Sequence, residues 1–140
     1  MAYWRIIAAA TLIHCFAGCG GGKMKLSGDV SFDGKPVEKG KIVLTPIGGT
    51  RGSSVGAAIE KGRFLIPAAQ GAPVGGEYKV EIAVIGPSGR KIPNIFDPKG
   101  PPLDENTNII PARYNVQSIL RVKVSPAPAE NHFEFALEKS

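Results

Sequence analysis

Apolar and polar residues alternate with a period of two through most of the chain after residue 25, and this pattern constrains the fold more than any other feature. The clearest case is the segment 78–84, which reads Tyr-Lys-Val-Glu-Ile-Ala-Val. Successive side chains of a strand point to opposite faces of a sheet, so such a segment predicts a strand with one buried face. No stretch after Cys19 has helical spacing over three turns. A mainly helical domain is therefore excluded.

Seven segments carry this alternation, and turn residues such as Asp33-Gly34-Lys35-Pro36 separate them. The segments are 26–32, 42–46, 55–59, 64–66, 78–84, 120–124 and 133–137. Seven short strands with turns between them predict an all-β domain, a seven-stranded β-sandwich over residues 25–140. A partly open five-stranded barrel is the main alternative.

The first nineteen residues have the organisation of an export signal. Arg5 precedes an apolar run over 6–16, and the small residues Ala17 and Gly18 stand before Cys19. As a helix the run would span about 16 Å, roughly half the apolar thickness of a bilayer, so a permanent transmembrane helix is not expected. An ordinary secretory signal cut near Ala17 or Gly18 would leave an unpaired thiol, which is uncommon in an exported protein.

Residues 16–19, Phe-Ala-Gly-Cys, resemble the lipobox of bacterial lipoprotein precursors. The resemblance implies a signal peptide over 1–18, acyl chains on Cys19 and a Gly-rich tether over 19–24. Acyl chains contribute about 0.8 kcal/mol per buried methylene, so two or three of them hold a protein on a membrane. The expected partner of Cys19 is therefore a membrane of the bacterial cell envelope. By analogy with that family, Gly20 favours the outer membrane over the inner one.

Few residues after Cys19 suit metal or nucleophilic chemistry. The whole chain has two histidines and two cysteines, and only His132 and Cys19 remain once 1–18 is removed. A zinc site usually draws most of its ligands from Cys and His, and a Ser-His-Asp triad would have to use His132. His132 alternates outward with Glu134, which predicts a histidine that faces solvent. We therefore expect no enzyme activity, no metal and no cofactor.

The positive charge is scattered along the chain. There are 17 Lys and Arg against 12 Asp and Glu, a net charge of +5, and the cations fall in turns or at alternating strand positions. Nucleic-acid binding needs a concentrated basic face, often with aromatic stacking partners. No nucleic-acid partner is expected.

The segment 86–108 departs from the alternating pattern, because it has five prolines, three glycines and no convincing strand. Loops longer than about 12–15 residues are usually functional or disordered. We interpret this one as a mobile excursion or, alternatively, as a binding loop that uses Phe96, Asp97, Asp104 and Glu105. Its oxygen ligands suit Ca²⁺, but their spacing does not match an EF-hand, so a calcium site is not expected.

The segment 110–115, Ile-Pro-Ala-Arg-Tyr-Asn, supplies the remaining candidate residues. Tyr114 is predicted to close one end of the domain with its hydroxyl bonded to backbone, as in the tyrosine corner of immunoglobulin-type domains. Arg113 would then pair with a carboxylate or an external ligand. Five other aromatic residues fall in the inward register: Phe32, Phe64, Tyr78, Phe133 and Phe135. That leaves Phe96 and Tyr114 as surfaces on which a sugar could stack.

Several segments together resemble small planctomycete-type lipoproteins. They are 30–37, 40–46, 62–64, 73–80, 110–115 and 133–137. That family is similar to carboxypeptidase regulatory-like, or transthyretin-like, domains, which are seven-stranded Greek-key sandwiches. It has no established catalytic residues. The resemblance implies a lipid-anchored, non-enzymatic envelope module with a structural or interaction role, and an envelope protein or polysaccharide as its partner.

Two other functions remain open. One is a ligand-binding lipoprotein that uses residues 86–108 to hold a glycan or a peptide. The other is a transthyretin-like hydroxyisourate hydrolase, a family with several active-site histidines and a Tyr-Arg-Gly-Ser C-terminal end. This chain ends Leu-Glu-Lys-Ser and keeps one histidine after Cys19, so the hydrolase is the least favoured.

Overall fold

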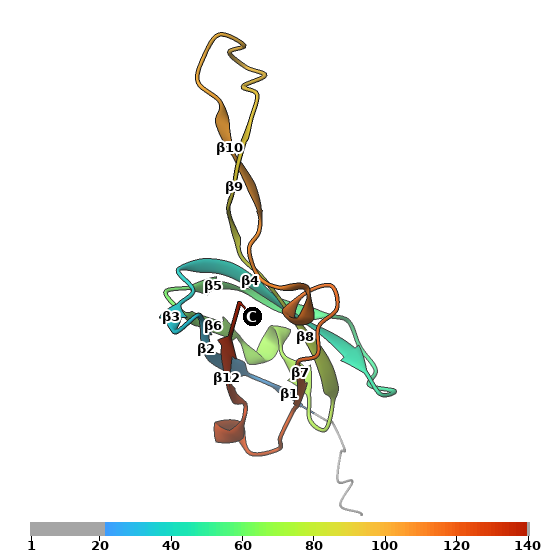
Figure 1. The fold of residues 1–140 in the computed structure, drawn as a ribbon. Helices are drawn as coiled ribbons and strands as arrows, with labels where there is room; N and C mark the ends of the chain where they lie inside the picture. The colour runs from blue at the N-terminus through green and yellow to red at the C-terminus, as the bar shows by residue number, and fades with distance from the viewer. Residues whose placement is uncertain (1–21, 140) are drawn as a thin grey trace, which may run out of the picture.

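The computed structural model describes residues 22–139, which form an all-β fold (Figure 1). Three single-turn 3-10 segments interrupt the described strands: η1 (Ala68–Gln70), η2 (Ala112–Tyr114) and η3 (Pro128–Glu130). None of the helical segments in this part of the chain is long and apolar enough to span a membrane. The predicted signal peptide and Cys19 lie outside the described residues.

One curled sheet makes up the body of the domain. Its strands are β2 (Leu26–Phe32), β3 (Lys35–Pro36), β4 (Lys39–Ile47), β5 (Val55–Glu60), β6 (Arg63–Ile66), β8 (Glu77–Ala83), β11 (Arg121–Lys123) and β12 (His132–Leu137). They follow the order β11-β8-β4-β5-β6-β2-β12, with β3 paired to β2. Neighbours pair antiparallel, except that β2 and β12 run parallel. The seven predicted strands are all confirmed, and they are the seven strands of this order.

Alternate residues of the main strands form a single apolar core inside the curl. Fully buried members include Leu26 on β2, Ile42 and Leu44 on β4, and Tyr78 and Ile82 on β8. The predicted inward register of the aromatic residues is also confirmed. Phe64 and Phe135 are buried, while Phe32 and Phe133 pack against the core from its edge.

Gly28 lets an aromatic ring approach the middle of β2. A Cβ at this position would lie 2.6 Å from Cε1 of Phe64 and 2.0 Å from the carbonyl oxygen of Phe133. Both distances are far below van der Waals contact, so a larger residue would force the ring or the neighbouring strand to move. Glycine is therefore required here for packing.

The folded domain begins earlier than the sequence predicts. The expected tether covered residues 19–24, yet β1 (Lys23–Met24) pairs antiparallel with β7 (Ala72–Pro73). Met24 also packs against the core. The close approach depends on Gly71, where a Cβ would lie 1.9 Å from the carbonyl oxygen of Met24. The boundary at residue 25 was thus placed two residues too late.

The segment 85–108 is a β-hairpin that projects from the body (Figure 1), so the expectation of no strand there was wrong. We call it the arm. It consists of β9 (Ile85–Ile92) and β10 (Leu103–Asn108), paired antiparallel with an irregularity between Asp104 and Asn106. None of its residues is buried. Period-two alternation arises only when one face of a strand is buried, so an arm wetted on both faces carries no such signal.

Hydrogen bonds fix the base of the arm to the body. The Ile109 N–H donates to the Val84 carbonyl at 2.9 Å, and Asn108 Oδ1 accepts from the N–H groups of Val84 (3.0 Å) and Ile110 (3.2 Å). β9 has 8 residues, so at about 3.4 Å per residue it extends about 27 Å from the body. The arm leaves the body at the end opposite β1 (Figure 1).

Candidate functional site

The tip of the arm, residues 93–102, exposes large apolar side chains. Ile95 is 78% exposed and Phe96 is 88% exposed. Asn94 Oδ1 accepts hydrogen bonds from the N–H groups of Phe96 (3.1 Å) and Asp97 (3.0 Å), which orders the turn. A pocket of about 680 Å³ opens beside Ile95 and is also lined by Ile92. An ordered turn that holds apolar side chains in water is a feature of interaction sites.

The three acidic candidates on the arm do not converge on one point. Asp104 forms an ion pair with Lys91 across the hairpin at 2.6 Å, and Glu105 accepts a hydrogen bond from the Ser88 hydroxyl at 2.6 Å. Asp97 accepts a backbone N–H from two residues further on, at 3.2 Å. These carboxylates stabilise the hairpin and its turn, so Phe96 is the predicted arm residue that remains free to contact a ligand.

Arg113 and Tyr114 lie on η2, which contacts β8, and not on the arm. Tyr114 is half-buried against the core, and its hydroxyl accepts the Glu138 N–H at 3.4 Å, as the predicted backbone bond requires. Arg113 was expected to pair with a carboxylate or an external ligand. Instead, its guanidinium lies 4.7 Å from the centre of the Tyr114 ring and donates to the Glu138 carbonyl at 2.6 Å. The six candidate residues therefore fall into two separate groups.

Sequence reasoning missed a polar cluster on the outer face of β2 and β12. The parallel register places His132 beside Ser27 and Glu134 beside Asp29. His132 Nε2 lies 2.9 Å from Asp29 Oδ2, and His132 Nδ1 lies 3.1 Å from Ser27 Oγ. The alternation did predict that His132 and Glu134 face solvent, and both are exposed. Nothing in the sequence indicated which strand lies next to them.

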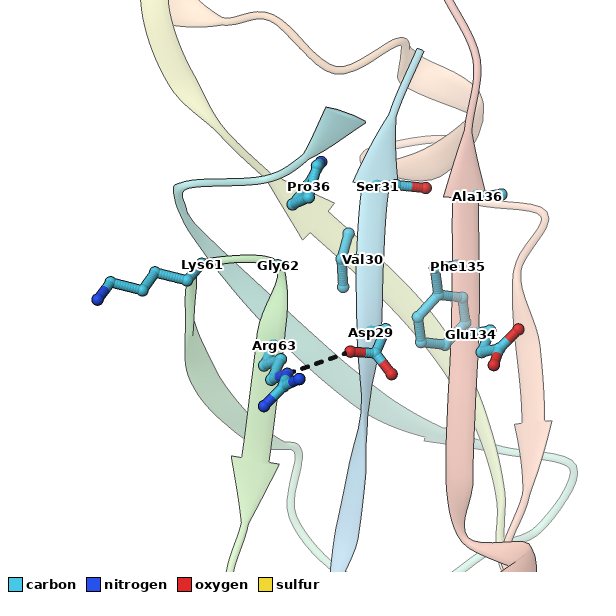
Figure 2. A pocket seen from close by; sticks show the side chains of 10 residues that line it. All are labelled: Asp29, Val30, Ser31, Pro36, Lys61, Gly62, Arg63, Glu134, Phe135 and Ala136. Atoms are coloured by element: carbon cyan, nitrogen blue, oxygen red, sulfur yellow. Dashed lines mark ion pairs between the residues drawn. The ribbon is translucent and has the colours of Figure 1, made fainter. Parts of the chain in front are cut away.

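A pocket of about 310 Å³ lies beside this cluster, between β2, β6 and β12 (Figure 2). The Arg63 guanidinium on β6 points to Asp29, and its Nε lies 3.6 Å from Asp29 Oδ1. Glu134 lies on the far side of Asp29, and Lys61 points away (Figure 2). One carboxylate oxygen of Asp29 thus faces a guanidinium and the other faces an imidazole.

Ser27, His132 and Asp29 have the residue types of a nucleophilic triad, but their surroundings do not suit acyl transfer. Such a reaction needs backbone N–H groups aimed at the developing oxyanion. The N–H of Ser27 is already used, because it donates to the Asn131 carbonyl at 3.1 Å. The imidazole and the Asp29 carboxylate are also about half exposed on an open sheet face. The arrangement holds the histidine in place without presenting Ser27 to a carbonyl substrate.

Comparison of the chain with protein-family models, with curated proteins and with solved structures found no match in any of the three. The resemblance to transthyretin-like lipoproteins therefore stays a prediction.

Proposed function

We propose that this protein is a lipid-anchored, non-enzymatic module of the bacterial cell envelope, and that it binds a partner protein through the tip of the arm. The observation that carries the proposal is the exposure of Ile95 and Phe96 at the end of an ordered hairpin. The arm contributes no residue to the core. The apolar side chains of its tip therefore do not stabilise the domain. Binding of a partner would bury them.

The charge of the arm favours a protein as the partner. Residues 85–108 contain three cations, Arg90, Lys91 and Lys99, and three acidic residues. The balance leaves no net attraction for an anionic polymer or an anionic membrane surface. Burial of apolar area is then the main source of affinity, at about 25 cal/mol per Å². Exposed aromatic residues with branched aliphatic neighbours are typical anchors in protein interfaces.

The position of β1 supports an anchor at the N-terminal end of the chain. The Phe-Ala-Gly-Cys segment ends at Cys19, four residues before β1 begins at Lys23. β1 lies at the end of the body opposite the arm (Figure 1). An acyl anchor on Cys19 would therefore present the body to the membrane and direct the tip of the arm away from it.

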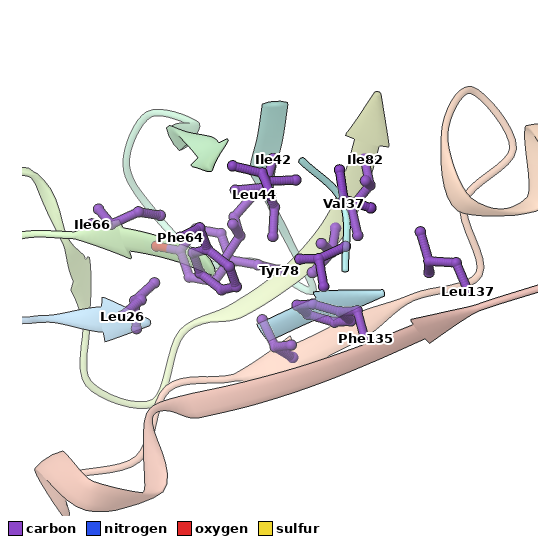
Figure 3. Packing of buried hydrophobic residues seen from close by; sticks show 14 of the residues in the cluster. Leu26, Val37, Ile42, Leu44, Phe64, Ile66, Tyr78, Ile82, Phe135 and Leu137 are labelled. Atoms are coloured by element: carbon purple, nitrogen blue, oxygen red, sulfur yellow. The ribbon is translucent and has the colours of Figure 1, made fainter. Parts of the chain in front are cut away.

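We further propose that the curled sheet is a Greek-key sandwich of the transthyretin-like type. β5 and β6 share a single residue pair, Glu60 with Arg63, so the sheet can bend sharply between these two strands. Figure 3 supports this bend, because Ile42 on β4 and Phe135 on β12 point toward each other from opposite sides of the core. β11-β8-β4-β5 would then form one layer, and β6-β2-β12 the other.

Photo-crosslinking in intact cells tests the proposed interaction. p-Benzoylphenylalanine replaces Phe96 in one variant and Val116, which is 75% exposed on the body, in the control. We expect one dominant protein adduct from position 96 and none of the same mass from position 116. Equal adduct patterns at the two positions, or no adduct at 96, would contradict the proposal.

A glycan or peptide ligand held at the tip is the alternative function. The observation that favours it is a pocket of about 680 Å³ lined by Ile95, the residue that precedes the exposed Phe96 in the chain. Phe96→Leu separates the two functions, because leucine keeps an apolar contact but has no aromatic face. A protein partner should retain most of its affinity for this variant, whereas stacking on a sugar ring would be lost. Binding of purified envelope polysaccharide that is abolished by Phe96→Leu would support the alternative.

A further inference from the structure

Three side chains able to bind a metal converge on the outer face of β2 and β12, on the body and not on the arm. Asp29, His132 and Glu134 each offer one ligand atom, and these atoms lie within 4.8 Å of one another. We propose that they form a binding site for a divalent transition-metal ion, with Zn²⁺ the best fit, and that water fills the remaining coordination position. This site is independent of the function proposed for the arm.

The backbone holds the three residues in a fixed triangle. His132 and Glu134 are two residues apart on β12, so both point to the same face of the sheet. Asp29 is paired with Glu134 in the parallel ladder, which places it on the neighbouring strand at the same level. β2 is held on its other side by β6, so the ladder is restrained from both directions. The three ligand atoms already lie within 4.8 Å of one another, so rotation of side chains, chiefly that of the exposed Glu134, would bring them to coordination distance of one ion.

The contacts of the imidazole suit a metal ligand. Ser27 Oγ lies 3.1 Å from His132 Nδ1, where it can accept the Nδ1–H and leave the Nε2 lone pair for an ion. A metal-bound histidine usually donates its second N–H to such an outer partner. His132 Nε2 and Asp29 Oδ2 are 2.9 Å apart. Two ligand atoms about 2.0–2.2 Å from one zinc ion are roughly 2.9–3.4 Å apart at angles of 90–109°.

Asp29 is itself oriented by an outer partner. Arg63 Nε lies 3.6 Å from Asp29 Oδ1. The other carboxylate oxygen, Oδ2, faces the imidazole of His132. The adjoining pocket, with Asp29 and Glu134 in its wall, gives water access to the open position (Figure 2). One imidazole with two carboxylates suits zinc better than calcium or magnesium, which prefer oxygen ligands alone.

The sequence predicts no zinc site when only cysteine and histidine are counted as ligands. Carboxylates also bind zinc, and a catalytic type of site uses three protein ligands with an open fourth position. Two carboxylates complete this set. Asp29 lies 103 residues before His132 in the chain, on β2, and Glu134 lies on the same strand as His132. Only the pairing of β2 with β12 brings them together.

The test titrates Zn²⁺ into the full, untagged chain with His14 replaced by alanine and both cysteines by serine. His132 is then the only histidine, and no thiol remains to compete. Isothermal calorimetry measures affinity, and nitrogen NMR of the single imidazole shows which ring nitrogen the ion contacts. We expect saturable binding of one ion through Nε2 that an excess of Mg²⁺ does not reverse.

Substitutions assign the ligands. His132→Ala, Asp29→Asn and Glu134→Gln should each weaken binding more than tenfold, and Ser27→Ala should weaken it about tenfold through loss of the outer hydrogen bond. Glu138→Gln, which removes a carboxylate just beyond β12, is the matched control and should bind as the parent does. Amide spectra verify that each variant is folded. No imidazole shift at millimolar Zn²⁺, or equal affinity in the folded His132→Ala variant, would overturn the proposal.

Discussion

Replacing Tyr78 with phenylalanine is expected to stabilise the protein. Tyr78 lies on β8 at the centre of the core (Figure 3), is 0% exposed, and its hydroxyl has no hydrogen-bond partner among the described residues. A buried polar group without a partner costs about 1–3 kcal/mol. Phenylalanine keeps the ring and its packing and removes only this cost.

The expected gain follows from that cost and from the void that the lost oxygen leaves. A single missing atom offsets part of the benefit, so the free energy of unfolding should rise by about 1–2 kcal/mol. For a domain of this size, the melting temperature should rise by about 4–8 °C. Tyr114→Phe is the matched control. Its hydroxyl accepts the Glu138 N–H, so this variant should lose about 0.5–1 kcal/mol.

The pH dependence gives a second check on the same residue. Burial raises the pKa of the Tyr78 phenol above its ordinary value of 10.0. Above about pH 10 the unfolded chain therefore loses this proton while the folded chain keeps it, and stability falls as the pH rises. Tyr78→Phe does not share that loss. The difference in stability between the two proteins should therefore widen from neutral to alkaline pH.

Urea unfolding at pH 7 and at pH 10.5, followed by circular dichroism, measures both effects. If Tyr78→Phe is less stable than the parent at pH 7, the hydroxyl has a partner and the reasoning about its cost is wrong. A difference that stays constant between the two pH values would refute the ionisation argument alone.

Three further changes test the packing. Gly28→Ala should lower the free energy of unfolding by about 2–3 kcal/mol because its Cβ would overlap Phe64, while Gly22→Ala, with no atom near its Cβ, should be neutral in urea unfolding. Tyr114→Ala should cost about 2–4 kcal/mol and lower the melting temperature, and an unchanged melting temperature would exclude its packing role. Replacing residues 88–105 by Asn-Gly closes the Pro87–Asn106 pair with a two-residue turn and should leave the melting temperature within about 2 °C, because the arm contributes nothing to the core. A larger drop would show that the arm supports the body.

The strands of the body were predictable because each buries one face. Tyr78, Phe64 and Phe135 lie at positions where the alternation placed them inward, and all three are buried. The arm was not predictable from that signal, because none of its residues is buried. Its prolines and glycines suggested a loop, yet a hairpin can accommodate them when its outer edges pair with nothing else in the described sheets.

The candidate site was predictable only in part. Exposure of Phe96 and the backbone bond of Tyr114 followed from the sequence. The partner of Arg113 did not, because it is the backbone carbonyl oxygen of Glu138, 25 residues further along the chain. The cluster around His132 was also missed, since the alternation fixes the face on which a residue lies but not the strand beside it. Long-range parallel pairing has no local sequence signal.

The most direct test of the account is the affinity of the partner captured at Phe96 for the chain in which Asn-Gly replaces residues 88–105. If the tip of the arm is the interaction surface, calorimetry should show affinity reduced by at least about 100-fold while the melting temperature stays unchanged. An affinity equal to that of the intact chain would place the binding surface on the body and contradict the account.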